Sequence, residues 1–382
     1  TNAPGVGEAL VRHLAEHYLT RGRAYLDLSV MHDNNEAMAL YEKIGFQRVP
    51  VFCIKRKNSI NEALYTRSFP ADDLNPYATI IVKEAQRRGI GVEVIDAEHG
   101  YFDLTHGGRR VACRESLTDL TSAVAMSRCD DKRVTHRVLA SAGLQVPRQR
   151  LAGNPDRNRR ILDEWRSVVV KPARGEQGNG ISVDLRTTED LETAIRRARR
   201  FCPDVLIEER VDGEDLRLIV IDYRLVAAAV RRPPVIVGTG RHTLRTLIDK
   251  YNRRRAAATG GEGCLPIDAE TKRCIHLAGL DLEDVPHAGR KVAVRKTANL
   301  HTGGTITDVT DRLHPDLAAV GAAAAKALEI PVTGLDLMVP DISQADYWII
   351  EANERPGLAN HEPQPTAERF VDLLFPQTAS AG

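Results

Sequence analysis

The sequence is short of aromatic residues, of net charge and of long apolar runs, and each shortage excludes a class of protein. Phenylalanine, tryptophan and tyrosine make up 5% of the 382 residues, which offers no obvious stacking surface for nucleic acid. A formal net charge of +1 with 27% charged residues gives no general attraction to nucleic acid or anionic membrane and argues against a disordered chain. No apolar run is long enough to span a bilayer, and no signal peptide is visible.

Cysteine is scarce as well, and its spacing argues against a disulfide framework. The six cysteines are scattered without a CxxC pair, as expected in the reducing cytosol, so we expect a cytoplasmic protein. Cys264, Cys274, His276 and His287 could be imagined as a zinc site, but their spacings fit no familiar zinc pattern. The length suggests about two or three domains. Because the first residue is Thr1 rather than methionine, we expect the gene product to be longer.

The stretch from Val168 to Val183, VVVKPARGEQGNGISV, is the most informative part of the chain. Three β-branched residues predict a buried strand, which Lys171 and a proline end, and a glycine-rich loop leads to a return strand. Lys171 can hold a phosphate oxygen as a point charge, while Gly175, Gly178 and Gly180 let backbone N–H groups approach the other oxygens. The pattern is neither GxxxxGK[ST] nor GxGxxG. We interpret it as a nucleoside triphosphate site; an ordinary glycine-rich hairpin loop is the alternative.

Further residues could complete a nucleotide site. Lys132 lies at the start of a predicted helix, although a surface lysine is the alternative. Glu208, Glu209 and Val211 lie where an apolar strand becomes a connector, and a carboxylate with backbone groups in such a place can bind an adenine edge. Asp215 follows closely and can accept hydrogen bonds from ribose hydroxyls.

The strongest set of residues lies near the end of the chain, in the β-like runs GLDLMV and YWIIEAN. Glu351 and Asn353 are two residues apart, so they project from one face of their strand, and Asp336 on the adjacent strand can join them. Three oxygen-donor side chains with room for water and phosphate are what Mg²⁺ requires. A surface salt bridge is the alternative for each carboxylate, but charges within apolar strands are costly to bury without a cation.

Basic and glycine residues between these stretches could bind a further anion. Arg217 is placed to face the same cleft. The stretch KVAVRKTANLHTGG is a strand and loop in which Arg295, Asn299, Gly303 and Gly304 form a second turn suited to an anion.

The first residues predict a helix from Gly5 to Arg21, a strand from Ala24 to Val30, a helix over NNEAMALYEKIGF and a strand from Gln47 to Lys55. A helix that begins after glycines can bind a pyrophosphate through its free N–H groups. An ordinary amphipathic helix with a glycine-rich cap is the alternative.

The turn GVGEALV, the strand LDLSV and NNEAMALYEKIGF resemble the C-terminal half of a GNAT acetyltransferase. The resemblance implies a coenzyme A pyrophosphate at Gly5 and Gly7, a pantetheine contact at Asn34, and Tyr41 as the group that protonates the departing thiolate. It covers only residues 1–57, and the strands that normally precede it are absent, which leaves an open sheet edge and an incomplete site. We therefore expect little or no acetyltransferase activity, and acetyl-CoA as a ligand only in a longer chain.

Five features follow one another in the order of the ATP-grasp superfamily. They are a lysine at a helix start, KP with a glycine flap, the connector EERV, an aspartate in a strand and ExN before PG. The chain resembles that superfamily from Ala125 to its end. We therefore predict a fold of the α/β and α+β classes, with a partial GNAT-like sheet followed by an ATP-grasp fold. The predicted domains are the half GNAT domain at 1–57, a linker at 58–75, a small leading α/β subdomain at 76–124 and the ATP-grasp domain at 125–382.

The resemblance implies that ATP lies between two subdomains, with Lys132, Lys171 and the flap on its phosphates and Mg²⁺ on the carboxylates. A substrate carboxylate attacks the γ-phosphorus, and an amine then displaces phosphate from the acyl phosphate. Some members place an arginine two residues before the first metal carboxylate, where this chain has Gly334. Arg295 is our candidate replacement, and it joins Lys171 as an expected catalytic residue. The loop from Asn360 to Glu362 could contact the amino-acid substrate, or could have no function.

Within the superfamily, TANLHTGG and IEANERPGLANH most resemble cyanophycin synthetases and the glutathione synthetase part of fused enzymes. A half GNAT domain ahead of such a grasp resembles the N-acetylglutaminylglutamine synthetase family. We predict an ATP- and Mg²⁺-dependent ligase that joins amino acids or N-acetyl amino acids, with N-acetylglutaminylglutamine as the product. The alternatives are a cyanophycin-type amino-acid ligase and an acetyltransferase with a regulatory nucleotide-binding domain. The sequence leaves open whether the chain forms a homo-oligomer.

Overall fold

The computed structural model describes residues 5–21, 26, 28, 30, 34–47, 74–175, 178–259 and 263–379. The predicted return strand from Gln47 to Lys55 and the predicted linker lie almost entirely outside the described residues, as does most of the predicted strand from Ala24 to Val30. Among the described helices, none is long and apolar enough to cross a membrane.

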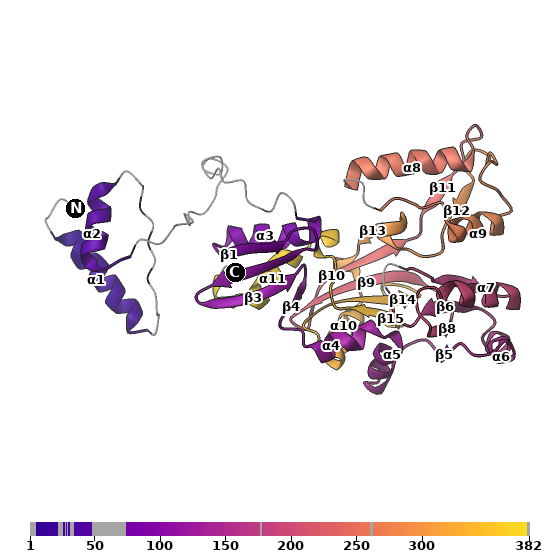
Figure 1. Ribbon diagram of the computed structural model, residues 1–382, viewed down its shortest axis with the longest axis horizontal. Helices are drawn as coiled ribbons and strands as arrows, with labels where there is room; N and C mark the ends of the chain where they lie inside the picture. Colours follow the sequence, from indigo (N-terminus) through magenta and orange to yellow (C-terminus); the bar gives the residue numbers. More distant parts are fainter. Residues whose placement is uncertain are drawn as a thin grey trace.

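Two helices form the described part of the N-terminal region, drawn in indigo in Figure 1. Helix α1 (Val6–Leu19) follows Gly5, whose φ of 84° is left-handed. Helix α2 (Asn35–Ile44) starts at Asn34, whose side chain accepts a hydrogen bond from the Ala37 N–H at 3.1 Å, and it ends at Gly45. An ion pair between Glu8 and Lys43 joins the helices, and neither helix buries a residue.

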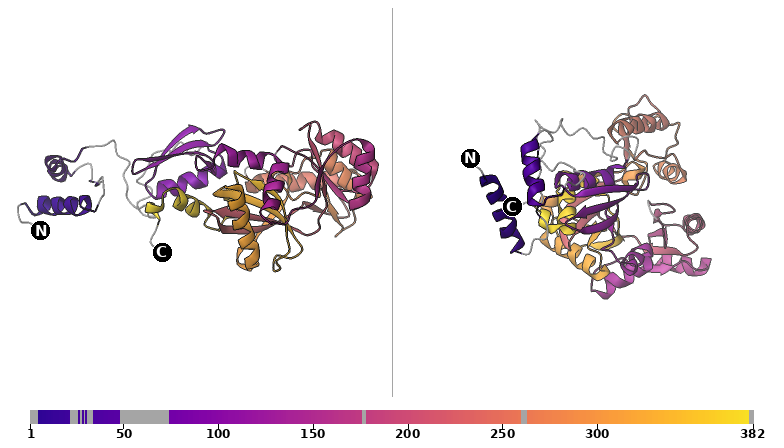
Figure 2. Two further views of the ribbon diagram at one scale, coloured as in Figure 1. Left: turned by 90° about the horizontal axis from the view of Figure 1, so that it is seen from below. Right: turned by 60° about the vertical axis from the view of Figure 1, so that its left-hand side comes forward.

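A small antiparallel sheet follows, with strands in the order β1-β2-β3-β4. Its elements are α3 (Pro76–Arg87), β1 (Gly91–Asp96), β2 (Tyr101–His106), β3 (Arg109–Arg114) and β4 (Leu117–Thr118). The C-terminal helix α11 (Thr366–Leu374) lies against α3, and the views of Figure 2 show these two helices side by side. Their shared core includes Ile81, Phe102, Leu104 and Phe370.

A second sheet carries the glycine flap. It has the order β5-β8-β6-β7 and is antiparallel throughout. Its strands are β5 (Gln149–Leu151), β6 (Val168–Pro172), β7 (Ser182–Leu185) and β8 (Val205–Glu209), and its helices are α6 (Pro155–Trp165) and α7 (Thr188–Ala198). Two helices, α4 (Ala123–Asp130) and α5 (Lys132–Ser141), precede it. The predicted strand, flap and return strand are confirmed as β6, the loop and β7.

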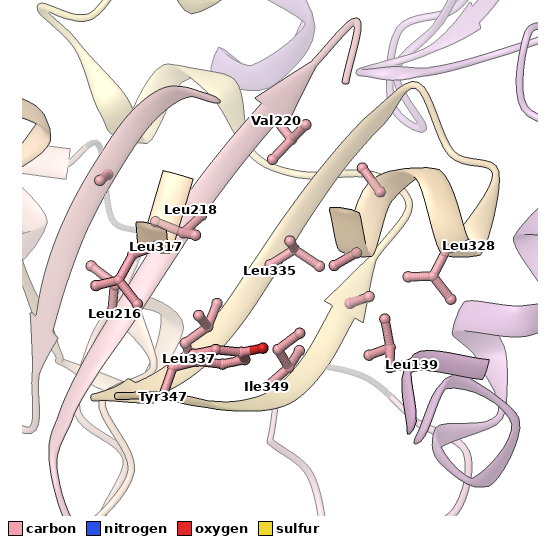
Figure 3. Packing of buried hydrophobic residues seen from close by; sticks show 14 of the residues in the cluster. Leu139, Leu216, Leu218, Val220, Leu317, Leu328, Leu335, Leu337, Tyr347 and Ile349 are labelled. Carbon is pink, nitrogen blue, oxygen red and sulfur yellow. The ribbon is translucent and has the colours of Figure 1, made fainter. Parts of the chain in front are cut away.

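The central sheet of the body has five strands in the order β13-β10-β9-β14-β15. These are β9 (Glu214–Ile221), β10 (Arg224–Arg232), β13 (Thr305–Asp308), β14 (Val332–Val339) and β15 (Trp348–Asn353). Helix α10 (Pro315–Leu328) covers one face and shares a core with β9 and β14; Figure 3 shows Leu317 of α10 beside Leu216 and Leu218 of β9. Because one face is sealed by this apolar core, the alternate residues of β9, β14 and β15 are left to line the other face.

An insertion between β10 and β13 has its own core, which includes Ile236, Leu244, Ile248 and Val292. It consists of β11 (Val235–Val237), α8 (Leu244–Thr259), α9 (Ala269–Leu277) and β12 (Lys291–Ala293). Short 3₁₀ turns complete the chain at η3 (Leu300–Thr302), η4 (Thr310–Arg312), η5 (Leu358–His361) and η6 (Pro376–Thr378). The mixed fold class predicted from the sequence is confirmed.

Candidate active site

A cavity of about 900 Å³ lies over the open face of the central sheet, between that sheet, the connector after β8 and the loop after β12. It gathers residues that the sequence analysis selected from distant stretches. The selected residues that line it are Lys171, Gly178, Glu208, Glu209, Val211, Asp215, Arg217, Arg295, Asn299, Asp336, Glu351, Asn353, Asn360 and His361. Lys132 lies beside the cavity because it contacts the cavity residue Glu351, and Gly175 lies next to Lys132, whose Nζ donates to the Gly175 carbonyl.

The two predicted phosphate lysines are both buried, and each pairs with a carboxylate. Lys171 Nζ lies 2.6 Å from Glu208 Oε2, which also accepts a hydrogen bond from Gln149 at 3.0 Å. Lys132 Nζ donates to the Gly175 carbonyl at 2.8 Å and lies 3.0 Å from Glu351 Oε1. Lys132 therefore joins the glycine flap to the strand that carries the predicted metal ligands.

The flap glycines adopt backbone conformations that favour glycine. The φ angles of Gly175, Gly178 and Gly180 are 134°, 77° and 75°. At Gly180 a Cβ atom would lie 2.8 Å from the ring of Phe201. The flap thus has the open backbone that was predicted, although residues 176–177 lie outside the described part of the chain.

The three predicted metal ligands come together where the middle of β14 pairs with the C-terminal end of β15. Asp336 is paired directly with Glu351, and Gly334 with Asn353. Within the described residues, no group of three or more His, Cys, Asp or Glu side chains could hold a metal. Two carboxylates and one amide nevertheless suit Mg²⁺, which keeps water or phosphate oxygens as its remaining ligands. The donor set therefore fits Mg²⁺.

Asp336 is held by two arginines of the same sheet, Arg217 of the adjacent strand β9 and Arg231 of β10, the next strand beyond it. Its Oδ1 accepts a hydrogen bond from Arg217 Nη1 at 2.5 Å, and its Oδ2 lies 2.9 Å from Arg231 Nη2. Arg231 also pairs with Asp215 at 2.7 Å. Burial opposes ionisation of Asp336, but the charges of Arg217 and Arg231 lower its pKa. Burial raises the pKa of Asp215 despite the same Arg231.

The arginine that contacts Asp336, the first predicted metal carboxylate, is Arg217 rather than Arg295, where we expected it. A Cβ atom on Gly334 would lie 2.5 Å from Arg217 Cζ, so the Arg217 guanidinium occupies the space that a side chain at 334 would need. Arg295 lines the cavity, but its Nη1 donates to Asp268 at 2.9 Å and to Thr271 at 3.0 Å in the insertion. Its buried Nε has no hydrogen-bond partner among the described residues.

His361 is buried in the cavity wall with 5% of its surface exposed. Burial, followed by the positive charges of Arg217 and Arg231, lowers its pKa to about 3. The ring is therefore neutral near pH 7. Its Nδ1 is buried without a hydrogen-bond partner among the described residues. Asn360 also lines the cavity.

Several cavity residues escaped the sequence analysis. Arg231 could have been recognised from the sequence. It is two residues from Ala229 on β10, so both face the same side of the sheet, and the two residues pair with Asp215 and Arg217 of β9. Tyr77, Glu115 and Arg355 also line the cavity. Glu115 comes from the small leading sheet, about 220 residues from Asp336, and no sequence pattern that we recognised joins it to the site.

The predicted coenzyme A residues lie on the two N-terminal helices. Gly5 and Gly7 stand at the start of α1, and Asn34 is the cap of α2, so its side-chain oxygen already accepts a backbone N–H. Tyr41 packs edge-on against Phe46, with the ring centroids 5.8 Å apart. Buried free thiols elsewhere, at Cys113, Cys129, Cys202 and Cys274, agree with the absence of a disulfide framework in the described residues.

Two family models match the chain. Residues 129–234 match the RimK-like ATP-grasp domain, and residues 4–46 match the acetyltransferase (GNAT) family. The first match contains both lysines, the flap and the connector, and the second contains both N-terminal helices.

Relatives and a solved structure agree with these matches. The chain is 32% identical to cyanophycin synthetase of Trichormus variabilis over 322 residues, which is 80% of this chain and 36% of that protein. It is 26% identical to the glutathione biosynthesis bifunctional protein of Clostridium perfringens over 325 residues, 80% of this chain and 41% of that protein. A bifunctional glutathione synthetase structure from Pasteurella multocida superposes with a TM-score of 0.57 at 23% identity, covering 80% of this chain and 44% of that one. The chain thus spans well under half of each.

Proposed function

We propose that this chain, which carries a RimK-like ATP-grasp domain behind a segment of a GNAT acetyltransferase, is an ADP-forming carboxylate–amine ligase that uses ATP and Mg²⁺. The observation that carries the proposal is the convergence of two buried lysines, the flap and the pair Asp336 and Glu351 on one cavity. Such a set binds a triphosphate at one end and a metal at the other.

The chain's own residues account for the chemistry by positioning and by charge. Lys132 and Lys171 hold phosphate oxygens, and the connector from Glu208 to Val211 receives the adenine. When Mg²⁺ is bound by Asp336, Glu351 and Asn353, it neutralises phosphate charge. A substrate carboxylate attacks the γ-phosphorus, ADP leaves, and the acyl phosphate is then attacked by an amine with release of phosphate.

Arg217 and Arg231 are the groups best placed to stabilise the negative charge of the acyl phosphate, because both already contact Asp336. Flap closure would exclude the water that otherwise hydrolyses this intermediate. Arg295 has a lesser part in this proposal than the sequence suggested, since its guanidinium is engaged by the insertion.

For the substrates, the relatives favour the cyanophycin-type alternative over the predicted dipeptide. Proteins named cyanophycin synthetase match 79% to 80% of this chain, and they support an enzyme that joins amino acids. The GNAT match at residues 4–46 supports N-acetylglutaminylglutamine synthesis as the second candidate. The domain division at 57, 75 and 124 remains part of this proposal. A purely regulatory nucleotide-binding domain fits less well, because a sensor need not keep Asp336, Glu351 and Asn353.

The test is phosphate release from Mg·ATP with free and N-acetylated amino acids, alone and in pairs, followed by mass detection of products. Release that requires two amino-acid substrates and gives a product of their joined mass, less water, would support the ligase. N-acetylglutamine with glutamine separates the second candidate from the first. Tight binding of Mg·ATP without release for any combination would favour the regulatory alternative.

A further inference from the structure

The small leading sheet contributes two side chains to the cavity that the proposed chemistry leaves without a role. Glu115, directly after β3, and Tyr77 of α3 line the cavity together with Arg355 of the loop after β15. Arg355 lies two residues past Asn353 and four past Glu351, on the same end of β15. The site therefore extends from the metal ligands towards the leading sheet.

The Glu115 carboxylate is fixed in this wall from three directions. Its Oε1 accepts a hydrogen bond from Asn75 Nδ2 at 2.9 Å, and its Oε2 accepts one from Arg355 Nη1 at 3.1 Å. Its backbone has a left-handed φ of 51°. Gly100 packs against the Glu115 side chain, and a Cβ atom at Gly100 would lie only 2.9 Å from Glu115 Cγ. Such a backbone conformation costs free energy and is typical of functional positions.

The loop that carries Arg355 is tied to the same region. The Ser116 hydroxyl donates to the Pro356 carbonyl at 2.7 Å. At Gly357 a Cβ atom would lie 2.8 Å from the ring of Tyr77. Asn75, the partner of Glu115, also caps α3 by accepting from the Ala78 N–H at 3.0 Å. The Glu115 carboxylate is therefore held by a helix start, and the Arg355 guanidinium is held by a loop tied to the leading sheet.

We propose that Glu115 and Arg355 form the binding site for the free amino acid that supplies the amine, with Glu115 on its α-ammonium group and Arg355 on its α-carboxylate. This inference rests on the proposed ligase function. An α-amino acid carries opposite charges on one carbon, and the two side chains present the complementary charges side by side. A carboxylate accepts at four lone pairs and a guanidinium has five donors, so each can bind a ligand while keeping its present partners.

The alternative is an ion pair that only joins the leading sheet to the body. Its matched control is the ion pair between Arg88 of the leading region and Asp372 of α11, at 2.5 Å, because neither residue lines the cavity. Asp372→Asn removes one charge from that junction, as Glu115→Gln does at the cavity.

The experiment is direct binding of the twenty common L-amino acids, one at a time, to the protein saturated with Mg·ADP. We expect Glu115→Gln to weaken binding of the selected amino acid about 10- to 100-fold, because a charge-assisted hydrogen bond is lost. Mg·ADP affinity should stay within about twofold, and Asp372→Asn should leave amino-acid binding unchanged. If no amino acid binds the unaltered protein, or if Glu115→Gln lowers only the melting temperature, the assignment is wrong.

A second variant keeps the assignment testable if Glu115→Gln does not fold. The unaltered protein should prefer the free amino acid to its α-amide, and Arg355→Gln should abolish that preference. An unchanged preference would overturn the assignment. The two proposals fail separately. If the variants bind the amino acid more weakly but the unaltered protein releases no phosphate from ATP, the amino-acid site stands and the ligase function is wrong. If phosphate is released and Glu115→Gln leaves the KM for the amino acid unchanged, the ligase function stands and the amino-acid site is wrong.

Discussion

The N-terminal helices and the body from residue 74 onward differ in how much apolar surface they bury. Helices α1 and α2 bury no residue, and Leu10 and Leu19 are each 62% exposed. In the body, Leu218 and Leu335 are fully buried between the central sheet and α10. Both regions match a known family, so the difference lies in tertiary structure rather than in how clear the sequence pattern is.

The difference shows what each kind of motif needs. The glycine turn of α1 and the Asn34 cap of α2 are local, because each depends only on residues in the first turn of one helix and needs no core. The cavity instead depends on register: Asp336, Glu351 and Arg217 meet because three strands pair in one alignment. A site of the second kind works only where the sheet is complete.

The largest expected effect is on activity. Glu351→Gln should lower ATP-dependent phosphate release about 1,000-fold, because it removes the charge of a proposed metal ligand that also pairs with Lys132. Asn34→Ala, at the predicted pantetheine contact, is the matched control in the N-terminal helices and should change the rate less than about twofold. Steady-state phosphate release measures both. Equal losses would mean that the two regions work as one site.

A buried and an exposed ion pair should differ in the free energy of unfolding. Lys171→Met leaves Glu208 buried and unpaired, which should cost about 3–5 kcal/mol. The double variant Lys171→Met/Glu208→Gln should recover much of that loss. Lys43→Met, which breaks the exposed pair with Glu8, should change the free energy of unfolding far less, because water screens that pair. Chemical denaturation measures all three, and a double variant no better than the single one would contradict the argument.

The same truncation should also have unequal effects in the two regions. Leu335→Ala should destabilise the protein by about 2–5 kcal/mol, since the side chain is fully buried beneath α10. Leu14→Ala, at a side chain that is 48% exposed, should change stability by no more than about 0.5 kcal/mol. A comparable loss at Leu14 would show that α1 has a packing partner.

His361 should make the body sensitive to acid. Its pKa in the folded protein is lowered to about 3, against an ordinary value of 6.5, so below pH 6.5 the unfolded chain binds a proton that the folded chain does not. The free energy of unfolding should therefore decrease as the pH is lowered from about 6.5 towards 3, by at most about 1.4 kcal/mol per pH unit from this group. His361→Gln should flatten that slope between about pH 6 and 4. His13→Gln, on the exposed surface of α1, is the control and should leave the slope unchanged. If His361→Gln has the same slope of unfolding free energy against pH as the unaltered protein, His361 is not the source of the acid sensitivity.

Sequence reasoning reached the parts of the site that short-range patterns encode. The run VVVKP predicts β6, and the two-residue spacing of Glu351 and Asn353 predicts a shared strand face, which the cavity lining agrees with. Arg217 was expected to face the cleft, but its place over Gly334 could not be predicted, because the two residues are 117 positions apart and meet only through the pairing of β9 with β14.

The contacts of Arg295 could not be predicted either, because they also join residues that are distant in the sequence. Its position after β12 suggested an anion site, but Asp268 and Thr271 from the start of α9 engage it. Glu115 had no signal, since its left-handed backbone and its contact with Arg355 depend on how the leading sheet packs on the body. Contacts between separate sheets are the information that a single sequence carries most weakly.

In the proposed function, this cavity activates a substrate carboxylate by phosphorylation. The most direct test supplies the unaltered protein with Mg·ATP and amino-acid substrates whose carboxylates carry ¹⁸O, and measures the isotope in the released phosphate. The account predicts that each phosphate carries one ¹⁸O atom from the substrate, because the acyl phosphate is cleaved between that oxygen and carbon. Unlabelled phosphate, or no release at all, would contradict it.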